Sequence, residues 1–373
     1  MEKDLGYRKV QCTGRGSFIT SLPKDWVQEN GIERGSEIAF KVLDDSSLIL
    51  VPRKIMEGKK ETEKPKLKEY WVFVEPKEDL QSVCRKLRAL YVVSAELIRI
   101  RFRDGGDASK YKEAVKELVR NMLLGSEIID ETPNEMTLQI LINHLQFPVE
   151  NAIRRMVILA LSANRNAILA LKNKDQNLIQ SVINENNDVN RLHLYVVRQL
   201  KYAIERNLFK ELGFRTQKEF LLYRIVANDI KNIADNAVNI VNNIATLKKL
   251  IENQTLFLKE SLDEEIYSQI LNFNSLAHQS FEESLKTLFQ RSYEQADKMF
   301  FKLESFTALE NDLITLMFSK KLDPNVASIF RLILDGSRRV VEYSRTVAEV
   351  TLNRTVEEIS SMPTFQQQRH HAH

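Results

Sequence analysis

Six long segments after Pro148 carry the apolar spacing of α-helices, and they restrict the fold more than any other feature of the sequence. Each segment is at least 23 residues long, and its apolar residues recur every three or four positions. Glycine and proline interrupt helices, and the 373-residue chain contains only 11 and 8 of them. Long amphipathic helices with short connections pack into bundles. The first three segments resemble the last three in length and order, so we predict two antiparallel three-helix bundles, at residues 148–248 and 252–358.

Residues 70–147 alternate between strand-like and helix-like patterns. The expected order is strand, helix, strand, helix, strand, strand, which is typical of a small α+β layer domain. The third of these elements places Ile98, Ile100 and Phe102 on one face of a strand. The last two strands are expected on either side of Pro133. This middle domain adds to the two bundles, so the predicted fold class is multidomain and mainly α.

Residues 7–53 are rich in β-strand patterns. Two short strands are separated by Gly14 and Gly16, and a short helix-like segment follows, with Gly31 at the position where helices commonly end. A hairpin is expected to turn at residues 44–47. A segment this short can hardly bury a hydrophobic core alone, so it needs a partner.

Composition excludes several classes of protein. The net charge of +3 is small for this length, so any contact with nucleic acid must come from a local basic patch. Cys12 and Cys84 are too few for a disulfide framework or a four-cysteine zinc site. Residues 55–69 form a Lys/Glu-rich charged linker, and the polar residues 359–373 are expected to be a disordered tail.

The sequence shows neither a membrane segment nor a catalytic motif. Its N-terminus lacks an apolar signal core, and no window approaches eighteen consecutive apolar residues, so we expect a cytoplasmic protein without membrane insertion. No nucleophile elbow, Walker loop, zinc-binding helix or dinucleotide fingerprint is present. We therefore predict that the chain is not an enzyme.

The N-terminal segment YRKVQCTGRGSFITSLPKDWVQENGIERGSEI, with the later DDSSLILVPRK, resembles the SpoVT/AbrB-like swapped-hairpin family. The matching features are the R-K-V opening, the T-G-R-G turn, the S-L-P-K-x-W helix start and the G-I-x-x-G-S connection. The resemblance implies that residues 1–54 form a DNA-binding domain in which two chains interleave their hairpins into one small barrel. It also implies contacts with double-stranded DNA from four basic residues, Arg8, Lys9, Arg15 and Lys24.

The segment LLYRIVANDIKNIADNAVNIVNNI resembles the signature helix of the PhoU family, with Asp235 and Asn239 at signature positions. A weaker second copy, SRRVVEYSRTVAEV, has Glu342 at the position of the aspartate. The resemblance covers roughly residues 149–355, as two three-helix bundles. It implies a role in the control of phosphate uptake, through contact with a phosphate-transport or signalling protein.

Many PhoU proteins carry a carboxylate four residues before the signature aspartate, and the resulting pair can hold iron or zinc. Here Lys231 precedes Asp235, and Arg338 precedes Glu342. A cation at that position repels a metal ion, and the spacing instead favours two i,i+4 ion pairs, each worth about 0.3–0.5 kcal/mol. We therefore expect no metal and no cofactor in the bundles.

The three parts together resemble the archaeal type of PhoU-domain regulator, which implies a homodimeric, DNA-binding transcriptional regulator of phosphate uptake. Two alternatives stay open. In the first, the barrel only dimerises, and the chain is an adaptor that regulates a phosphate transporter by protein–protein contact. The acidic residues Asp25, Glu29 and Glu33 near the basic positions favour that interpretation. In the second, the bundles are a metal-loaded sensor.

Overall fold

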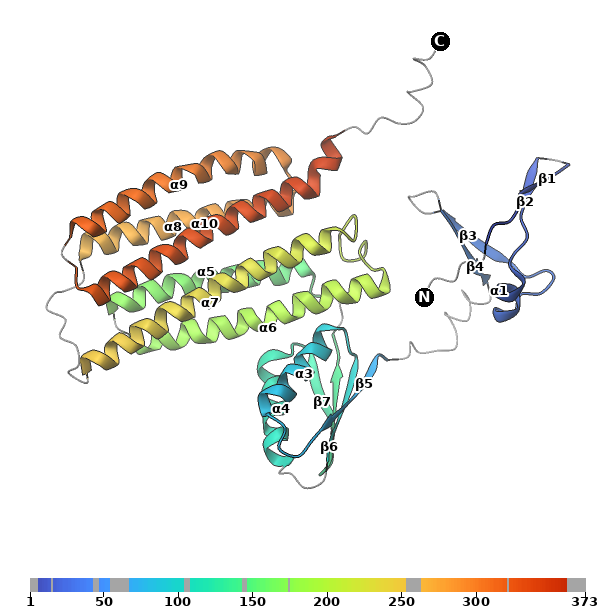
Figure 1. Cartoon of the computed structure of the whole chain (residues 1–373), viewed down its shortest axis with the longest axis horizontal. Helices are drawn as coiled ribbons and strands as arrows, with labels where there is room; N and C mark the ends of the chain where they lie inside the picture. The colour runs from blue at the N-terminus through green and yellow to red at the C-terminus, as the bar shows by residue number, and fades with distance from the viewer. Residues whose placement is uncertain are drawn as a thin grey trace, which may run out of the picture. The chain divides into compact units, whose positions relative to one another are not determined.

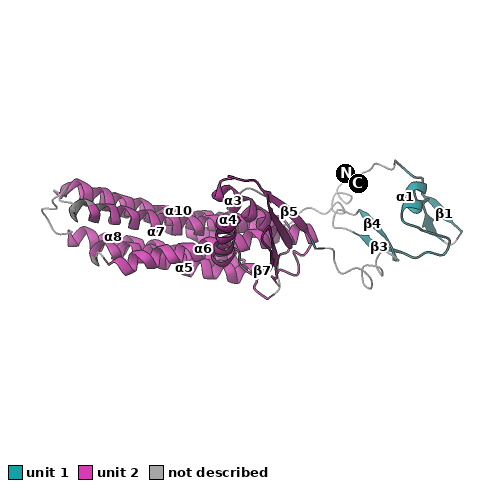
Figure 2. Cartoon of the chain, turned by 90° about the horizontal axis from the view of Figure 1, so that it is seen from below, with its two compact units in different colours: residues 1–67 teal, residues 68–373 magenta. Residues whose placement is uncertain are grey.

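The computed structural model describes residues 6–14, 16–42, 47–53, 67–103, 108–142, 146–173, 175–252, 263–320 and 322–360. The chain divides into two compact units, residues 1–67 and residues 68–373, which are coloured separately in Figure 2. The predicted turn at residues 44–47 therefore lies largely outside the described residues, as do most of the predicted linker and tail.

The elements described in unit 1 include two β-hairpins and a short helix (Figure 1). The antiparallel hairpins pair β1 (Gln11–Thr13) with β2 (Ser17–Ile19) and β3 (Ile38–Val42) with β4 (Leu48–Pro52). Helix α1 (Lys24–Glu29) lies between the hairpins in the chain. It ends where Gly31 adopts a left-handed φ of +57°, a conformation that glycine tolerates without strain. The predicted strands, helix end and second hairpin are confirmed.

The described residues of unit 1 bury almost nothing. Pro52 is the only one of them that is classed as buried, and apolar side chains on both hairpins are exposed, among them Phe18, Phe40, Val42 and Leu48. The two hairpins form separate two-stranded sheets, so one chain does not close a barrel within its described residues. The barrel predicted above needs a second chain, and that part stays a prediction.

The first part of unit 2 is a four-stranded sheet with two helices on one face (Figure 1). Its elements are β5 (Glu69–Val74), α3 (Leu80–Val92), β6 (Leu97–Phe102), α4 (Ala108–Met122), β7 (Ser126–Glu131) and β8 (Glu135–Ile140). The strand order is β5-β6-β8-β7, with β5 parallel to β6 and the other neighbours antiparallel. This is the α+β order that the sequence predicts.

Alternation along the strands explains which face of this sheet the helices cover. Val72 and Val74 of β5 are buried, whereas Trp71 and Phe73, which alternate with them, are about half exposed. On β6 the predicted face is confirmed, because the three residues predicted for it are all buried: Ile98, Ile100 and Phe102. These strand residues form one hydrophobic core with the inner faces of α3 and α4. Asp79 caps α3, its carboxylate accepting the N–H of Ser82 at 2.8 Å.

Six long helices make up the rest of unit 2. The first three are α5 (Val149–Asn173), α6 (Gln176–Arg206) and α7 (Glu219–Glu252), and the last three are α8 (Glu264–Gln290), α9 (Tyr293–Ser319) and α10 (Pro324–Ile359). Four of them begin at a side chain that accepts a backbone N–H of the first turn: Asp175, Asp263, Ser292 and Asp323. The two predicted trios are confirmed, whereas the domain boundaries within unit 2 stay predictions. No helix in the described part of the chain has an apolar stretch long enough to cross a membrane.

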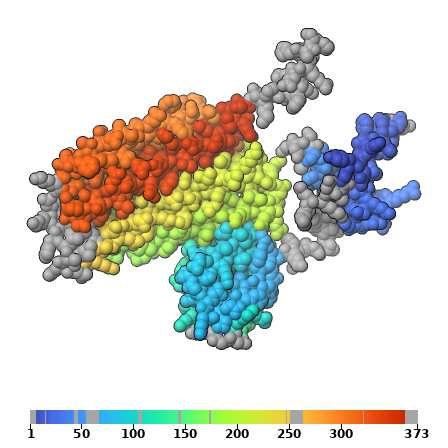
Figure 3. Space-filling model, in the orientation of Figure 1, coloured from blue at the N-terminus to red at the C-terminus, as the bar shows by residue number. Residues whose placement is uncertain are grey.

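The two trios pack against each other along their length (Figure 3). Contacts of α10 with α7 and of α5 with α8 join them, and the buried apolar residues of both trios form one continuous core. Polar side chains also cross this boundary. The Asn164 side-chain oxygen accepts a hydrogen bond from Asn274 Nδ2 at 2.7 Å and lies 2.9 Å from His278 Nε2, so α5 and α8 are joined through buried groups.

A buried ionic cluster joins α7 to α8 and α10. The carboxylate of Glu219 accepts hydrogen bonds from Arg354 Nε and from Arg291 Nη1, the latter at 3.0 Å. Burial alone would raise the pKa of Glu219, but the Arg215 N–H and the two guanidinium groups reverse this and lower it. Arg354 also donates to the carbonyl of Leu288 at 2.8 Å. Its buried charge is therefore fully compensated.

Candidate functional sites

Three of the four predicted DNA contacts can be placed in unit 1. Arg8, Lys9 and Lys24 are exposed, and Arg15 lies outside the described residues. Arg8 Nη1 donates to the carbonyl of Tyr7 at 3.0 Å. Lys24 is the first residue of α1. Among the described residues neither lysine forms an ion pair, so both ammonium groups are accessible to a ligand.

The PhoU-like signature lies on α7. Ala234 and Ala237 are buried in the core, whereas Asp235 is half-buried and Asn239 is exposed. The carboxylate of Asp235 therefore lies at the edge of the apolar face of α7. Lys231 and Asp235 form the predicted i,i+4 ion pair.

The second copy of the signature lies on α10. Arg338 forms the predicted ion pair with Glu342, and its Nε lies 3.6 Å from a carboxylate oxygen of Glu310 on α9. Both ion pairs that the spacing predicts are confirmed. Within the residues that the structure describes, no hydrogen bond or ion pair joins Asp235 to Glu342.

His193 of α6 adds a buried imidazole close to the first signature. Its Nε2 lies 2.7 Å from Arg224 Nη1, and because a guanidinium only donates, this nitrogen must act as the acceptor. Burial, together with the nearby charges of Arg224 and Lys231, lowers the pKa of His193 to about 4, and the charge of Asp235 opposes this shift. The described residues contain no group of three His, Cys, Asp or Glu side chains that could hold a metal ion.

The α+β part is fixed to α6 by charged side chains. Arg198 is 1% exposed, and its Nη1 donates to the carbonyl of Tyr91, at the end of α3, at 2.7 Å. The same guanidinium lies over the Tyr91 ring, 5.0 Å from its centroid. Lys68 and Glu205 form a second link, an ion pair of 2.9 Å. These contacts connect α6 directly to α3 and to the residues that lead into β5.

A known family model matches the first three of the long helices. The sequence model of the PhoU domain matches residues 153–244, which run from α5 through most of α7. Residues 153–244 form a PhoU domain. The match contains Asp235, Asn239 and Lys231, and it covers the first trio only. The resemblance of residues 252–358 to the PhoU family therefore rests on their helical arrangement and on the weaker signature around Glu342.

A second sequence model matches unit 1. It describes "Antidote-toxin recognition MazE, bacterial antitoxin", and it covers residues 11–57. The N-terminus is thus a MazE/AbrB-like domain, which confirms the resemblance noted in the sequence. Neither match distinguishes an archaeal subtype of PhoU-domain protein.

Two solved PhoU structures are similar to this chain. The phosphate transport system regulatory protein PhoU from Streptococcus pneumoniae is 17% identical, with a TM-score of 0.42 over 57% of this chain and 96% of that chain. PhoU from Pseudomonas aeruginosa is 16% identical, with a TM-score of 0.41 over 56% of this chain and 96% of that chain. No curated protein matches the chain.

Sequence reasoning missed the buried cations that join the parts of unit 2. Arg198 and Arg354 are 1% and 8% exposed, and each lies inside an apolar helical stripe. A charged residue on the buried face of a helix is rare unless it has a partner. That interruption of the stripe was the available signal, but the partners, Tyr91 and Glu219, could be named only from the structure.

Proposed function

We propose that this chain is a homodimeric DNA-binding transcriptional regulator of phosphate uptake. The observation that carries the proposal is the combination, on one chain, of a MazE/AbrB-like domain at residues 11–57 with a PhoU domain at residues 153–244. The first kind of domain suggests binding to DNA or to a toxin-type partner. The second suggests regulation of phosphate transport.

Exposed apolar side chains in unit 1 support the homodimer. Phe18, Phe40 and Val42 are 75%, 65% and 74% exposed in the single chain. A domain with so little buried surface lacks the hydrophobic contribution that folding requires. A second copy with interleaved hairpins would bury the same side chains of both chains in one core. We propose that residues 1–54 dimerise in this way.

Exposed basic side chains support contact with DNA. Arg8, Lys9 and Lys24 are accessible, and we propose that they contact phosphate groups together with Arg15. Each such contact releases condensed counterions, so the affinity for DNA should fall steeply with salt. Symmetry of the dimer would present the four residues twice, as expected for a duplex site with two half-sites.

The bundles are the proposed sensing or docking part. We propose that a phosphate-transport or signalling protein docks on the PhoU domain in the cytoplasm and changes the position of α6. The Arg198–Tyr91 and Lys68–Glu205 contacts would pass that change to the start of β5, which follows the linker from the DNA-binding domain. Asp235, Asn239 and Glu342 are the proposed signature residues of the docking helices, with Lys231 and Arg338 in place of metal ligands.

The proposal predicts salt-sensitive binding to duplex DNA. Fluorescence anisotropy of a labelled genomic promoter fragment, titrated with the full chain at about 50 mM and about 200 mM salt, measures both the affinity and its salt dependence. The double variant Arg15→Ala, Lys24→Ala should bind at least about tenfold more weakly. The slope of log affinity against log salt should fall by about 0.9 for each phosphate contact removed.

A matched control separates local contacts from net charge. The double variant Lys298→Ala, Arg331→Ala removes the same charge from exposed ion pairs on α9 and α10 and should bind DNA like the wild type. A dimer that binds duplex DNA weakly, with no salt dependence and no effect of Arg15 and Lys24, contradicts the proposal. It would favour the alternative in which the N-terminal domain only dimerises and the chain is an adaptor for a transporter.

A further inference from the structure

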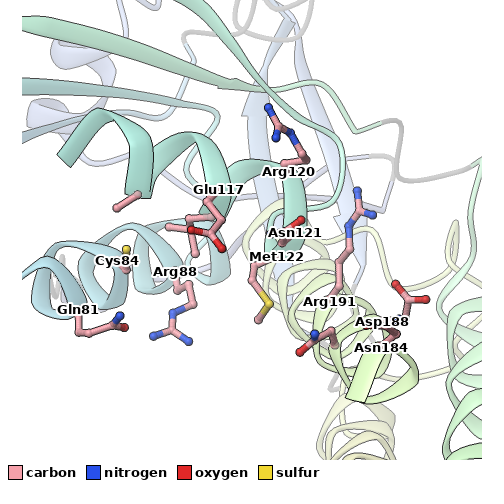
Figure 4. Close-up of a pocket in the computed structure, with 13 residues that line it drawn as sticks. Gln81, Cys84, Arg88, Glu117, Arg120, Asn121, Met122, Asn184, Asp188 and Arg191 are labelled. Atoms are coloured by element: carbon pink, nitrogen blue, oxygen red, sulfur yellow. The ribbon is translucent and has the colours of Figure 1, made fainter. Parts of the chain in front are cut away.

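A groove opens where the α+β part of unit 2 meets the first bundle (Figure 4). It is lined by α3, α4 and α6 and has a volume of about 650 Å³. Small-molecule sites in proteins commonly measure about 300–1,000 Å³ and often lie where two packed parts of a protein meet. The groove therefore has the size and the position of a ligand site.

Each of the three helices contributes one arginine to the groove: Arg88 from α3, Arg120 from α4 and Arg191 from α6. In the part of the chain that the structure describes, none of these three forms a hydrogen bond or an ion pair. Guanidinium groups without protein partners can bind carboxylate or phosphate oxygens, often with two parallel hydrogen bonds.

Within the described residues of the α+β part, only the arginines of the groove lack a partner. The other arginines between residues 68 and 142 all pair with a carboxylate: Arg85 with Asp79, Arg99 with Glu69, Arg101 with Glu135 and Arg103 with Glu75. Acidic residues are therefore available in this part of the chain, and a shortage of them cannot explain why Arg88 and Arg120 lack ion-pair partners.

Arg191 is a half-buried residue in the α6 wall of the groove. Its Nε is buried and has no hydrogen-bond partner among the described residues. A buried donor without a partner costs about 1–3 kcal/mol, and native proteins keep few of them. The Nε is closed to solvent, so a ligand in the groove would have to contact the η nitrogens of Arg191.

Two carboxylates also line the groove, and they restrict the class of ligand. Glu117 and Asp188 lie three residues before Arg120 and Arg191 on the same helices, yet neither carboxylate pairs with a described residue. With three arginines and two acids, the groove carries a single net positive charge. The acids can accept hydrogen bonds from hydroxyl or amino groups, which a simple inorganic anion lacks.

The position of Arg88 further favours an extended ligand. In Figure 4 it lies at the opposite end of the groove from Arg120 and Arg191, so one small ion cannot contact all three. Asparagine side chains on α4 and α6, including Asn121 and Asn184, add neutral donors and acceptors between the charged groups.

We infer that this groove binds a nucleoside triphosphate. Arg120, Arg191 and Arg88 bind its phosphate oxygens, and Glu117 and Asp188 accept hydrogen bonds from its hydroxyl or amino groups. A ligand held there joins α3 and α4 to α6 across the same junction as the Arg198–Tyr91 contact. The inference goes beyond the proposed function, because the groove can bind a nucleotide whether or not unit 1 binds DNA.

Isothermal titration of the full chain with ATP, GTP, CTP and inorganic phosphate tests the inference. At least one of the nucleotides should bind with a Kd below about 1 mM, and inorganic phosphate should bind at least about tenfold more weakly. The single variants Arg191→Gln and Arg120→Gln should each weaken nucleotide binding at least about tenfold, because each removes a charge-assisted hydrogen bond. Arg120 is exposed, so its replacement leaves folding unchanged.

Arg85→Gln is the matched control, since Arg85 lies on α3 outside the groove and pairs with Asp79 at 3.3 Å. Its nucleotide affinity should stay within about twofold of the wild type, well below the tenfold effect of a lost charged contact. Absence of nucleotide binding, equal affinity for inorganic phosphate, or nucleotide binding that the groove variants leave unchanged each overturns the inference. These titrations contain no DNA, so their failure is distinct from failure of the anisotropy experiment.

Discussion

The carboxyl group of Asp229 lies between α7 and α10, where few polar groups replace its lost contact with water. The residue is 8% exposed, and its Oδ2 has no hydrogen-bond partner among the described residues. Burial raises the pKa of Tyr343 on α10, and the nearby charge of Asp229 raises it further. Burial raises the pKa of Asp229 itself to about 6 from an ordinary value of 3.8.

This shift predicts a pH-dependent cost to folding. The pKa is higher in the folded state, so the contribution of Asp229 to stability is greatest below pH 4 and is lost as the pH rises to about 6. The loss amounts to about 3 kcal/mol. Between pH 4 and pH 7, the free energy of unfolding of Asp229→Asn should therefore rise by about that amount relative to the wild type. Urea unfolding followed by circular dichroism measures it.

Glu211→Gln, which changes an exposed carboxylate between α6 and α7, serves as the control and should show no such change with pH. Parallel pH profiles for Asp229→Asn and the wild type would contradict the assignment.

At the scale of single residues, the sequence predicted ion pairs correctly where both partners lie on one helix. The pairs Lys231–Asp235 and Arg338–Glu342 follow from the i,i+4 spacing alone. The sequence made no prediction for Asp229, because the burial of that residue depends on a neighbouring helix whose rotation the periodicity of α7 does not determine.

At the scale of helices, α7 and α10 approach each other closely at Gly336. A Cβ atom added there would lie 2.9 Å from Cγ of Asn236, whose Oδ1 is buried and without a partner among the described residues. A glycine in a helix interior normally costs about 1 kcal/mol relative to alanine. Close packing of the two trios explains why glycine occupies position 336.

Gly336→Ala should therefore destabilise the protein by about 1–3 kcal/mol despite its better helix propensity. In an Asn236→Ala background the same change should be neutral or stabilising, because the side chain that it meets is gone. A double-mutant cycle from thermal or urea unfolding measures the coupling. Additive effects of the two changes would show that α7 and α10 do not meet at this position.

The long helices and the strands were predictable because their signals are local. Alternation predicts the buried face of β6, and apolar spacing predicts α5 to α10. The pairing of β8 between β6 and β7 is different, because it depends on contacts between residues far apart in the chain. The same applies to the groove, whose arginines come from three helices and share no spacing in the sequence.

At the scale of the whole molecule, we propose that a dimeric DNA-binding domain is joined to a PhoU domain that responds to phosphate supply. The domains themselves rest on sequence matches to residues 11–57 and 153–244. The DNA contacts at Arg8, Lys9, Arg15 and Lys24 are proposed from the resemblance, since exposure alone does not select them from other surface cations.

Genome-wide DNA occupancy of the native protein, measured in cells grown at high and at low phosphate, tests the central claim most directly. We predict occupancy at a limited set of promoters that includes phosphate-transport genes, with a change between the two conditions. The Arg15→Ala, Lys24→Ala variant should lose these sites while remaining dimeric. Occupancy no greater than background, or sites that are unrelated to phosphate transport and insensitive to phosphate, would contradict the account.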